Sequence, residues 1–151
     1  MISIHPKLLW LGHALDAREP RALYDAGIKA VVDLAFAESP AVLPRDFIYC
    51  RFPLLDGGGN EPAVLRLALQ TIVNLLDARL PTLVACSVGM SRSPTLAAFA
   101  LSAHLHSKPK EVVLRISELK SLEINGALWN DVSTVYQSLE LGKNSFSSNR
   151  E

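Results

Sequence analysis

One short segment of the chain combines a nucleophile, a glycine and a cation at fixed spacing. It runs Cys86-Ser87-Val88-Gly89-Met90-Ser91-Arg92-Ser93-Pro94, so five residues separate the cysteine from the arginine. The apolar residues 83–85 before it predict a short buried strand, and Pro94 indicates the first turn of a helix. A loop between a strand and a helix N-terminus can turn several backbone N–H groups inward. Together with the helix dipole, these groups form an anion site.

The residue types of this segment suit phosphate chemistry. Gly89 permits a backbone conformation that is closed to residues with a Cβ atom. Arg92 offers a planar, two-pronged donor that matches phosphate oxygens. The same N–H groups and Arg92 are expected to stabilise the thiolate form of Cys86. A thiolate beneath a bound phosphate is a nucleophile that faces phosphorus. The expected product of its attack is a phosphocysteine intermediate.

Phosphoester cleavage also needs an acid for the leaving group, and Asp56 is the candidate. It follows the β-rich stretch 47–52, precedes the glycine run 57–59, and lies thirty residues before Cys86. If the two strands are neighbours, both loops meet at one edge of the sheet. Asp56 would protonate the leaving group and then deprotonate the attacking water. Ser93 would hydrogen-bond the sulfur and ease its departure. A turn aspartate and a helix N-cap are the simpler interpretations of these two residues.

The pattern resembles the dual-specificity branch of the cysteine-dependent protein phosphatases. Cys86, Arg92 and Ser93 match its C-x5-R-S core, and Asp56 stands where that family carries its general acid. The likeness extends over roughly residues 5–140. It implies one phosphatase domain over residues 1–141, a polar tail over 142–151, and no metal or organic cofactor. It also implies a phosphate cradled by the backbone N–H groups of Ser87, Val88, Gly89, Met90, Ser91 and Arg92.

Several positions depart from the family or remain open. Ala85 replaces a histidine that favours the thiolate in the family, which predicts a weaker enzyme or a higher pH optimum. The glycine run 57–59 predicts a loosely held acid loop. Cys50 fits a core strand cysteine better than the protective disulfide partner of some relatives. Asn125 is equally consistent with support of the Cys86 loop and with a simple Asn-Gly turn.

Short apolar strands alternate with amphipathic helices along the chain. This alternation predicts an α/β domain with a short, mostly parallel sheet flanked by helices, and the resemblance implies the protein tyrosine phosphatase-like version of it. Ligands of such sheets bind at the carboxyl ends of the strands, where the loop after Cys86 begins. Strands are expected at 8–11, 30–34, 47–52 and 83–85, and helices from 20 to before 27, from 62 to about 76, at 93–105, at 112–119 and at 128–139.

Composition bounds the remaining possibilities. The 151 residues fit one domain. Hydrophobic residues make up 49% of the chain and charged residues 20%, a composition that excludes wholesale disorder. Fifteen basic and fifteen acidic residues give a net charge of zero, which does not indicate general binding of nucleic acid or acidic membranes. No apolar run reaches the ~18 residues of a membrane span. With two cysteines, the expectation is a cytoplasmic protein in a reducing compartment; access to the nucleus stays open.

The substrate class follows from what the loop lacks. Relatives that act on phosphoinositides or RNA triphosphate ends carry basic residues in or near this loop. Residues 87–91 include no lysine or arginine, so the resemblance favours singly phosphorylated substrates. Phosphotyrosine, phosphoserine or phosphothreonine in proteins is the first expectation, and small phosphorylated metabolites stay open. Two other functions remain: a pseudophosphatase that binds phosphate with little turnover, which Ala85 favours, and a rhodanese-like sulfurtransferase, which the Arg92-Ser93 pair fits poorly.

Overall fold

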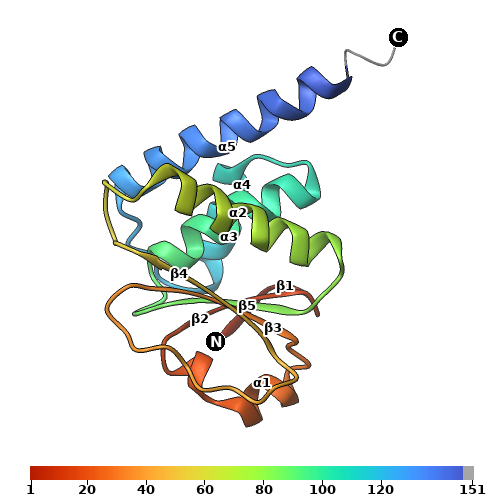
Figure 1. Cartoon of the computed structure of the whole chain (residues 1–151), viewed down its shortest axis with the longest axis vertical. Helices are drawn as coiled ribbons and strands as arrows, with labels where there is room; N and C mark the ends of the chain where they lie inside the picture. The colour runs from red at the N-terminus through yellow and green to blue at the C-terminus, as the bar shows by residue number, and fades with distance from the viewer. Residues whose placement is uncertain (148–151) are drawn as a thin grey trace.

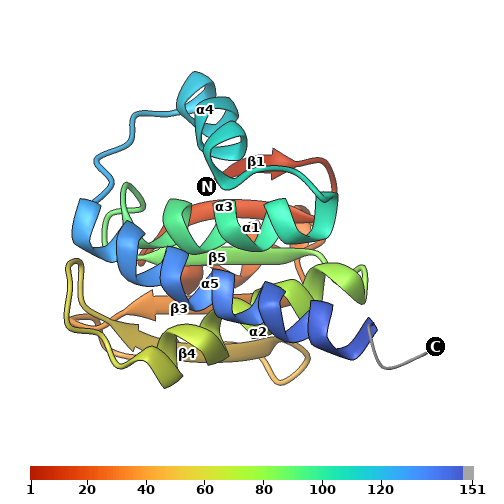
Figure 2. The same ribbon diagram turned by 90° about the horizontal axis from the view of Figure 1, so that it is seen from above.

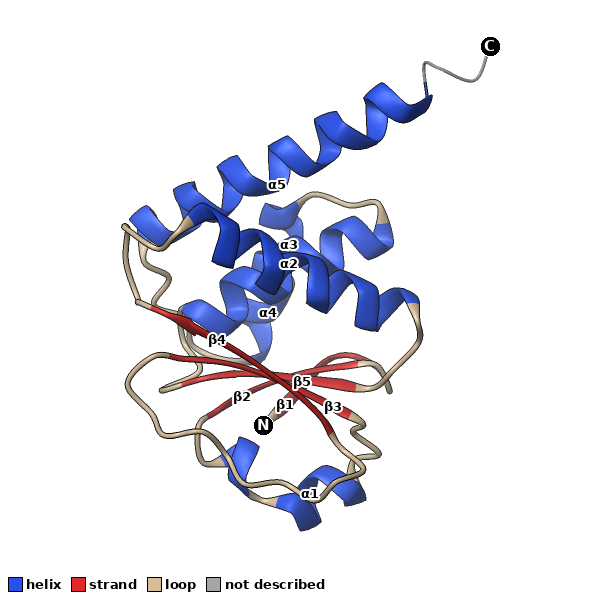
Figure 3. Ribbon diagram, viewed as in Figure 1, coloured by secondary structure: helices blue, strands red, loops and turns tan. Residues whose placement is uncertain are grey.

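A computed structural model describes residues 1–147 of the chain, and side chains through residue 140. The strands form one five-stranded sheet of order β1-β2-β5-β3-β4. Five α-helices and one 3-10 helix complete the described part of the fold; η1, α1 and α2 connect strands, and α3, α4 and α5 follow β5 (Figure 3). The strands are β1 (Ile2–His5), β2 (Leu9–His13), β3 (Ala30–Ala35), β4 (Ile48–Leu54) and β5 (Thr82–Cys86). The helices are η1 (Asp16–Arg18), α1 (Pro20–Asp25), α2 (Pro62–Asp77), α3 (Arg92–Leu105), α4 (Pro109–Leu119) and α5 (Gly126–Ser147).

The sheet is parallel except at one edge. β2, β5, β3 and β4 pair in parallel, while β1 pairs antiparallel with β2. The predicted α/β architecture with a mostly parallel sheet is therefore confirmed. β1 is absent from the sequence-based prediction because His5, Pro6 and Lys7 interrupt the apolar pattern. Lys7 takes a positive φ of 57° in the hairpin turn that makes β1 possible.

The helices divide unequally between the two faces of the sheet. α1 lies on one face and α2, α3, α4 and α5 lie on the other (Figure 1). The larger buried cluster fills the four-helix side, and a smaller one lies between the sheet and α1. Viewed from above, α4 lies near the β1 edge and α2 near the β4 edge, with α3 between them (Figure 2). α3 is the central element: every residue from Arg92 to Ser102 is buried.

The helix predicted from residue 62 to about residue 76 is confirmed as α2. Pro62 occupies its first turn, where the missing N–H costs nothing. One face of α2 is buried, at Leu65, Ala68, Leu69, Ile72, Val73, Leu75 and Leu76. Burying one leucine or isoleucine side chain of this face contributes about 1.5–3 kcal/mol, which fixes the helix against the sheet.

The last helix extends further than the sequence indicates. α5 runs from Gly126 through Ser147, so residues 142–147 of the predicted polar tail are helical. Residues 148–151 lie outside the described part. Asn125 caps the helix, since its Oδ1 accepts the backbone N–H groups of Ala127 and Leu128 at 3.0 and 3.1 Å. Within residues 1–147, no helix combines the length and apolarity that crossing a membrane requires.

Candidate active site

The sulfur of Cys86 lies at the focus of several hydrogen-bond donors. The residue ends β5 and is only 2% exposed. The backbone N–H groups of Gly89 and Ser93 donate to Sγ at 3.2 and 3.4 Å, and the hydroxyl of Ser93 lies 3.3 Å from it. Sγ also faces the N-terminus of α3, whose dipole favours negative charge. The sulfur thus lies where hydrogen-bond donors and the helix dipole point to one place.

Three carbonyl groups of the loop that joins Cys86 to Arg92 bind partners outside the loop. Ser87 O accepts the N–H of Ala14 at 3.4 Å, and Met90 O accepts that of Glu123 at 3.0 Å. Gly89 O accepts the ammonium of Lys120. Gly89 has a φ of +81°, as the sequence predicts for this turn. With these carbonyls held outside, N–H groups of the loop are left to face inward as an anion cradle.

A second set of contacts holds the end of the loop. Asn125 donates its N–H to Ser91 Oγ at 2.9 Å, and Ser91 O accepts both the N–H and the hydroxyl of Thr95, at 3.0 and 2.7 Å. Of the two roles that the sequence left open, the structure shows the first, because the backbone of Asn125 supports the Cys86–Arg92 loop. Its side chain caps α5 instead of forming a simple Asn-Gly turn. Val88, at the tip of the loop, is 64% exposed.

Arg92 is oriented by the strand at the other side of the site. Its Nη1 donates to the carbonyl of Leu54, the last residue of β4, at 2.8 Å. The residue is buried, and its Nε has no hydrogen-bond partner among the described residues. An arginine that is anchored at one end of its guanidinium and unpartnered at Nε is ready to bind an oxyanion.

Asp56 shares a cavity with the cysteine and the arginine. This cavity has a volume of about 120 Å³, and its lining is formed by Asp56, Cys86, Val88, Met90, Ser91, Arg92 and Glu123. β4 and β5 are separated by β3. The two strands that lead to Asp56 and Cys86 are therefore not direct neighbours in the sheet. Their loops nevertheless meet, because parallel strands end at one edge.

The glycine run after Asp56 is held by a side chain that the sequence did not single out. Asn60 Oδ1 accepts the N–H of Leu55 at 2.8 Å, and Asn60 Nδ2 donates to Leu55 O and Gly57 O at 2.9 and 3.2 Å. These three hydrogen bonds join the residues on both sides of Asp56. The expectation of a loosely held acid loop overlooked this bracing contact. An asparagine four residues after the aspartate is the signal that was available.

Two further residues contact the loop without having been predicted. Glu123 lines the cavity, and Lys120 binds the loop at Gly89. Both come from the connection between α4 and α5, about thirty residues from the C-x5-R segment in sequence. Their residue types are common on surfaces, so nothing in their local pattern indicates a role. Only the fold brings them to the site.

Cys50 lies apart from Cys86 on another strand. Both cysteines are free thiols. Cys50 is in register with Val32, which is itself in register with Val84. Two strand spacings and two residues along the strand separate the Cα atoms by roughly 12 Å, too far for a disulfide. Cys50 packs against the main apolar cluster, and burial raises the pKa of its thiol. These observations agree with a core strand cysteine.

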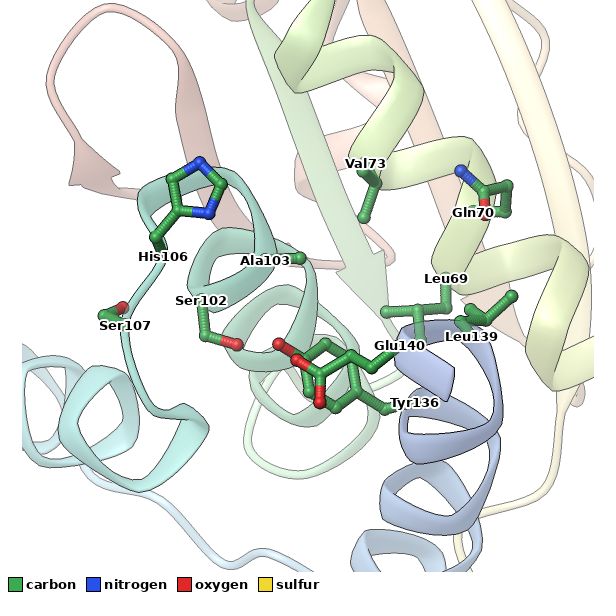
Figure 4. Close-up of a pocket in the computed structure, with 10 residues that line it drawn as sticks. All are labelled: Leu69, Gln70, Val73, Ser102, Ala103, His106, Ser107, Tyr136, Leu139 and Glu140. Carbon is green, nitrogen blue, oxygen red and sulfur yellow. The ribbon is translucent and has the colours of Figure 1, made fainter. Parts of the chain in front are cut away.

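A larger cavity lies at the C-terminal end of α3, the end opposite to Cys86 and Arg92. It has a volume of about 470 Å³ between α2, α3 and α5, and none of the predicted site residues line it. Figure 4 shows Ser102, Tyr136 and Glu140 gathered at one place in its wall. Burial raises the pKa of Tyr136, a hydrogen bond to Ser102 lowers it, and a hydrogen bond to Glu140 raises it. Tyr136 thus interacts with both Ser102 and Glu140.

Comparison with known proteins shows that the chain shares its fold with solved structures. No family model and no curated protein sequence matches the chain. Human DUSP28 superposes with a TM-score of 0.81 at 20% identity, over 94% of this chain and 99% of that one. The chain has the fold of the dual-specificity phosphatases. The sequence-based resemblance to this family is therefore matched in three dimensions.

Other solved structures share this fold. Human tyrosine phosphatase-like serine/threonine/tyrosine-interacting protein matches with a TM-score of 0.77 at 18% identity, over 92% of this chain and 96% of that one. PTPMT1 in complex with PI(5)P matches with a TM-score of 0.74 at 15% identity, over 94% and 97%. At these identities the likeness is one of fold, so the chemistry of this chain rests on its own site.

Proposed function

We propose that the chain is a cysteine-dependent phosphatase that hydrolyses phosphomonoesters. The observation that carries the proposal is the common cavity of Cys86, Arg92 and Asp56, with the Cys86 sulfur accepting two backbone N–H groups. A nucleophile, an oxyanion donor and an acid therefore meet where a phosphate group fits. Residues 1–141 would form the catalytic domain.

The first chemical step transfers the phosphoryl group to the cysteine. The thiolate of Cys86 attacks phosphorus while the bond from phosphorus to the ester oxygen breaks. Arg92 and the inward N–H groups of residues 87–92 stabilise the negative oxygens in the transition state. Asp56 gives its proton to the departing oxygen, so the product leaves as a neutral alcohol or phenol. The enzyme is left as phosphocysteine, with Asp56 ionised.

The second step returns the enzyme to its starting state. Asp56 takes a proton from a water molecule, and the resulting hydroxide forms a new bond to phosphorus as the sulfur–phosphorus bond breaks. The thiolate that departs regains its hydrogen bonds from Gly89 and Ser93. The hydroxyl of Ser93, 3.3 Å from the sulfur, stabilises this leaving group. Inorganic phosphate then dissociates.

The charge of the cavity supports a singly phosphorylated substrate. Among the described residues that line it, Arg92 is the one cation, while Asp56 and Glu123 are acidic. A ligand with several phosphate groups would bring further negative charge without matching cations. We therefore propose a phosphoprotein substrate carrying phosphotyrosine, phosphoserine or phosphothreonine. The two free thiols support a reducing, cytoplasmic compartment.

A binding function without turnover is the second candidate. Ala85, the residue before the nucleophile, is fully buried in the apolar cluster beside α1, and its methyl side chain offers the loop no hydrogen bond. One protein of the same fold is described as phosphatase-like and interacting. The intact set of Cys86, Arg92 and Asp56 favours the enzyme over this alternative.

Hydrolysis of p-nitrophenyl phosphate from pH 5 to 9, with reductant and without added metal, tests the proposal. We expect turnover in the wild type and its loss in Cys86→Ser. The pH profile should be bell-shaped, because the reaction needs an ionised thiol and a protonated carboxyl together. A folded wild type that binds vanadate without turnover would favour the binding function. Sulfur transfer from thiosulfate would instead indicate a sulfurtransferase.

A further inference from the structure

Lys120 contacts the Cys86–Arg92 loop from outside. It is the residue that follows α4, its side chain is half-buried, and its Nζ donates to the carbonyl of Gly89. Neither the sequence pattern nor the proposed chemical steps assign it a role. It is nevertheless a cation bound to the one glycine of the loop, whose N–H donates to the nucleophilic sulfur.

The contact determines which way a loop peptide faces. In a trans peptide the N–H points opposite to the C=O. Because Gly89 O points outward to Lys120, the N–H of Met90 in the same peptide points to the opposite side. Met90 lines the cavity that holds Cys86 and Arg92. Lys120 therefore stabilises the orientation in which this N–H is available to a bound oxyanion.

The space around Gly89 leaves no room for a side chain at this position, so side-chain packing at residue 89 does not hold the peptide. A Cβ atom at this position would come within 2.9 Å of Gly12 O and 3.3 Å of Lys120 Nζ. Gly12 pairs in register with Ala85, which presents only a methyl group. The polar contact that the structure gives to the Gly89 carbonyl comes from the α4–α5 connection. Lys120 provides it together with positive charge.

We propose that Lys120 is a positioning residue of the phosphate site, which holds the Gly89–Met90 peptide with its N–H inward and favours both the Cys86 thiolate and a bound phosphate dianion. The inference rests on the proposed function, because it concerns the same loop. It adds a second cation to a site in which Arg92 is the one described cation of the cavity lining.

Other charged groups face Lys120 and enter the design of the test. Lys120 shares a cavity of about 200 Å³ with His13, Asp16 and Met1. The Met1 amine pairs with Asp16 at 3.0 Å, and His13 Nδ1 lies 3.6 Å from the same carboxylate. On the cavity side of the loop the titratable groups are Asp56, Glu123, Arg92 and Cys86 itself. His13 is therefore the group whose titration most needs separating from that of the thiol.

The test measures thiolate reactivity and phosphate binding without requiring turnover. The rate of alkylation by iodoacetamide is followed from pH 5 to 10 in a Cys50→Ser background, so that Cys86 is the reporting thiol. Protection by inorganic phosphate gives the dissociation constant. For Lys120→Met we expect the alkylation midpoint to rise by about one pH unit and phosphate binding to weaken about tenfold. Lys120→Arg should retain most of both properties.

Controls make each outcome decisive. Lys110→Met removes an exposed lysine from the first turn of α4 and should change neither property. Lys120→Met should change the alkylation midpoint and phosphate binding equally in the presence and absence of His13→Gln. Thermal unfolding verifies that every variant is folded. If Lys120→Met does not fold, Lys120→Gln is measured in its place. An unchanged midpoint and unchanged phosphate protection in the folded variant would overturn the inference.

The two proposals can fail separately. A wild type that does not hydrolyse p-nitrophenyl phosphate, but whose thiol reactivity and phosphate binding depend on Lys120, disproves the phosphatase and leaves the role of Lys120 intact. A wild type that turns over, with thiol reactivity and phosphate binding independent of Lys120, keeps the phosphatase and removes this role.

Discussion

The two cysteines of this chain show how environment separates a nucleophile from a structural thiol. Both lie on strands of the sheet. Cys50 contacts the apolar cluster, and burial raises the pKa of its thiol. Cys86 is more deeply buried, and its sulfur accepts hydrogen bonds from the backbone N–H groups of Gly89 and Ser93. Burial of a thiol opposes its ionisation, whereas N–H donors directed at the sulfur oppose that effect.

The two carboxylates of the cavity should respond to mutation in opposite directions. Asp56→Asn removes the proposed acid, so we expect kcat to fall by about 10² to 10⁴. Glu123→Gln removes a negative charge from a cavity that must accept a phosphate dianion. It should lower KM and tighten vanadate binding by about threefold, because the charge lies near the surface in high dielectric. Steady-state kinetics with p-nitrophenyl phosphate and inhibition by vanadate measure these effects.

The contrast between these variants also identifies the acid. If Glu123→Gln loses kcat and Asp56→Asn does not, then Glu123 protonates the leaving group. Phenyl phosphate serves as control, since its leaving group is more basic than p-nitrophenol, needs more proton donation and should enlarge the defect of Asp56→Asn.

At this scale the sequence reveals only residues whose spacing is itself diagnostic. Cys86, Arg92 and Ser93 are predictable because five intervening residues and a following helix start restrict what the segment can do. Asp56 is predictable from a strand end followed by glycines. Glu123 and Lys120 are not, because surface-type residues on a distant connection reach the loop only through the packing of α4 and α5.

At the scale of elements, the acid loop depends on Asn60. Its side chain makes three hydrogen bonds across Asp56, each worth about 1 kcal/mol in net terms. We expect Asn60→Ala to lower kcat about tenfold, because the carboxyl group then samples positions away from the leaving oxygen. Vanadate affinity should stay within about twofold, since Asn60 is not in the lining of the cavity.

A matched variant exists on α2. Asn74 is exposed and accepts one side-chain hydrogen bond from Gln70 at 3.0 Å, away from the site. Asn74→Ala should leave kcat unchanged while costing similar or less stability. Equal activity of Asn60→Ala and wild type would show that the glycine run holds its conformation without the asparagine.

Regular elements were more predictable than their ends. The helix at α2 and the strand at β5 follow from apolar periodicity and from proline at their borders. β1 was missed because four residues interrupted by polar side chains carry too little signal, and an edge strand needs its partner to form. The extension of α5 through Ser147 was missed because residues after 141 lose apolar periodicity. A helix that is already nucleated can continue through such residues.

At the scale of the whole molecule, a pair of histidines connects the edge strand of the sheet to the helical layer. His5 at the end of β1 lies near His104 of α3, with ring centroids 6.4 Å apart. His104 Nδ1 lies 2.8 Å from Asp77 at the end of α2. Desolvation by burial, followed by His104, Arg115 and Arg79, lowers the pKa of His5 below its usual value of 6.5. These contacts thus link β1 to α3, and α3 to the end of α2.

This contact predicts lower stability in mild acid. Because His5 has a lower pKa when folded, the unfolded chain binds a proton more readily, and stability falls as the pH drops from about 6.5 toward the folded pKa. His5→Gln should therefore show a smaller decrease in Tm between pH 7.5 and 5.5 than the wild type. Thermal unfolding by circular dichroism measures the difference. Parallel Tm curves for the two proteins would exclude His5 as the source.

The burial of α3 has a consequence for how the molecule loses function. Local opening costs most where buried contacts are dense, and least in exposed glycine-containing segments. Amide exchange should therefore be slowest in α3, which anchors Ser93 and Arg92, and fast around Asp56 in the exposed loop. Partial openings would release Asp56, the proposed proton donor, while the proposed phosphate-binding loop keeps its structure. Under mild denaturation, the protein would pass through a state that captures phosphate yet cannot expel an alcohol.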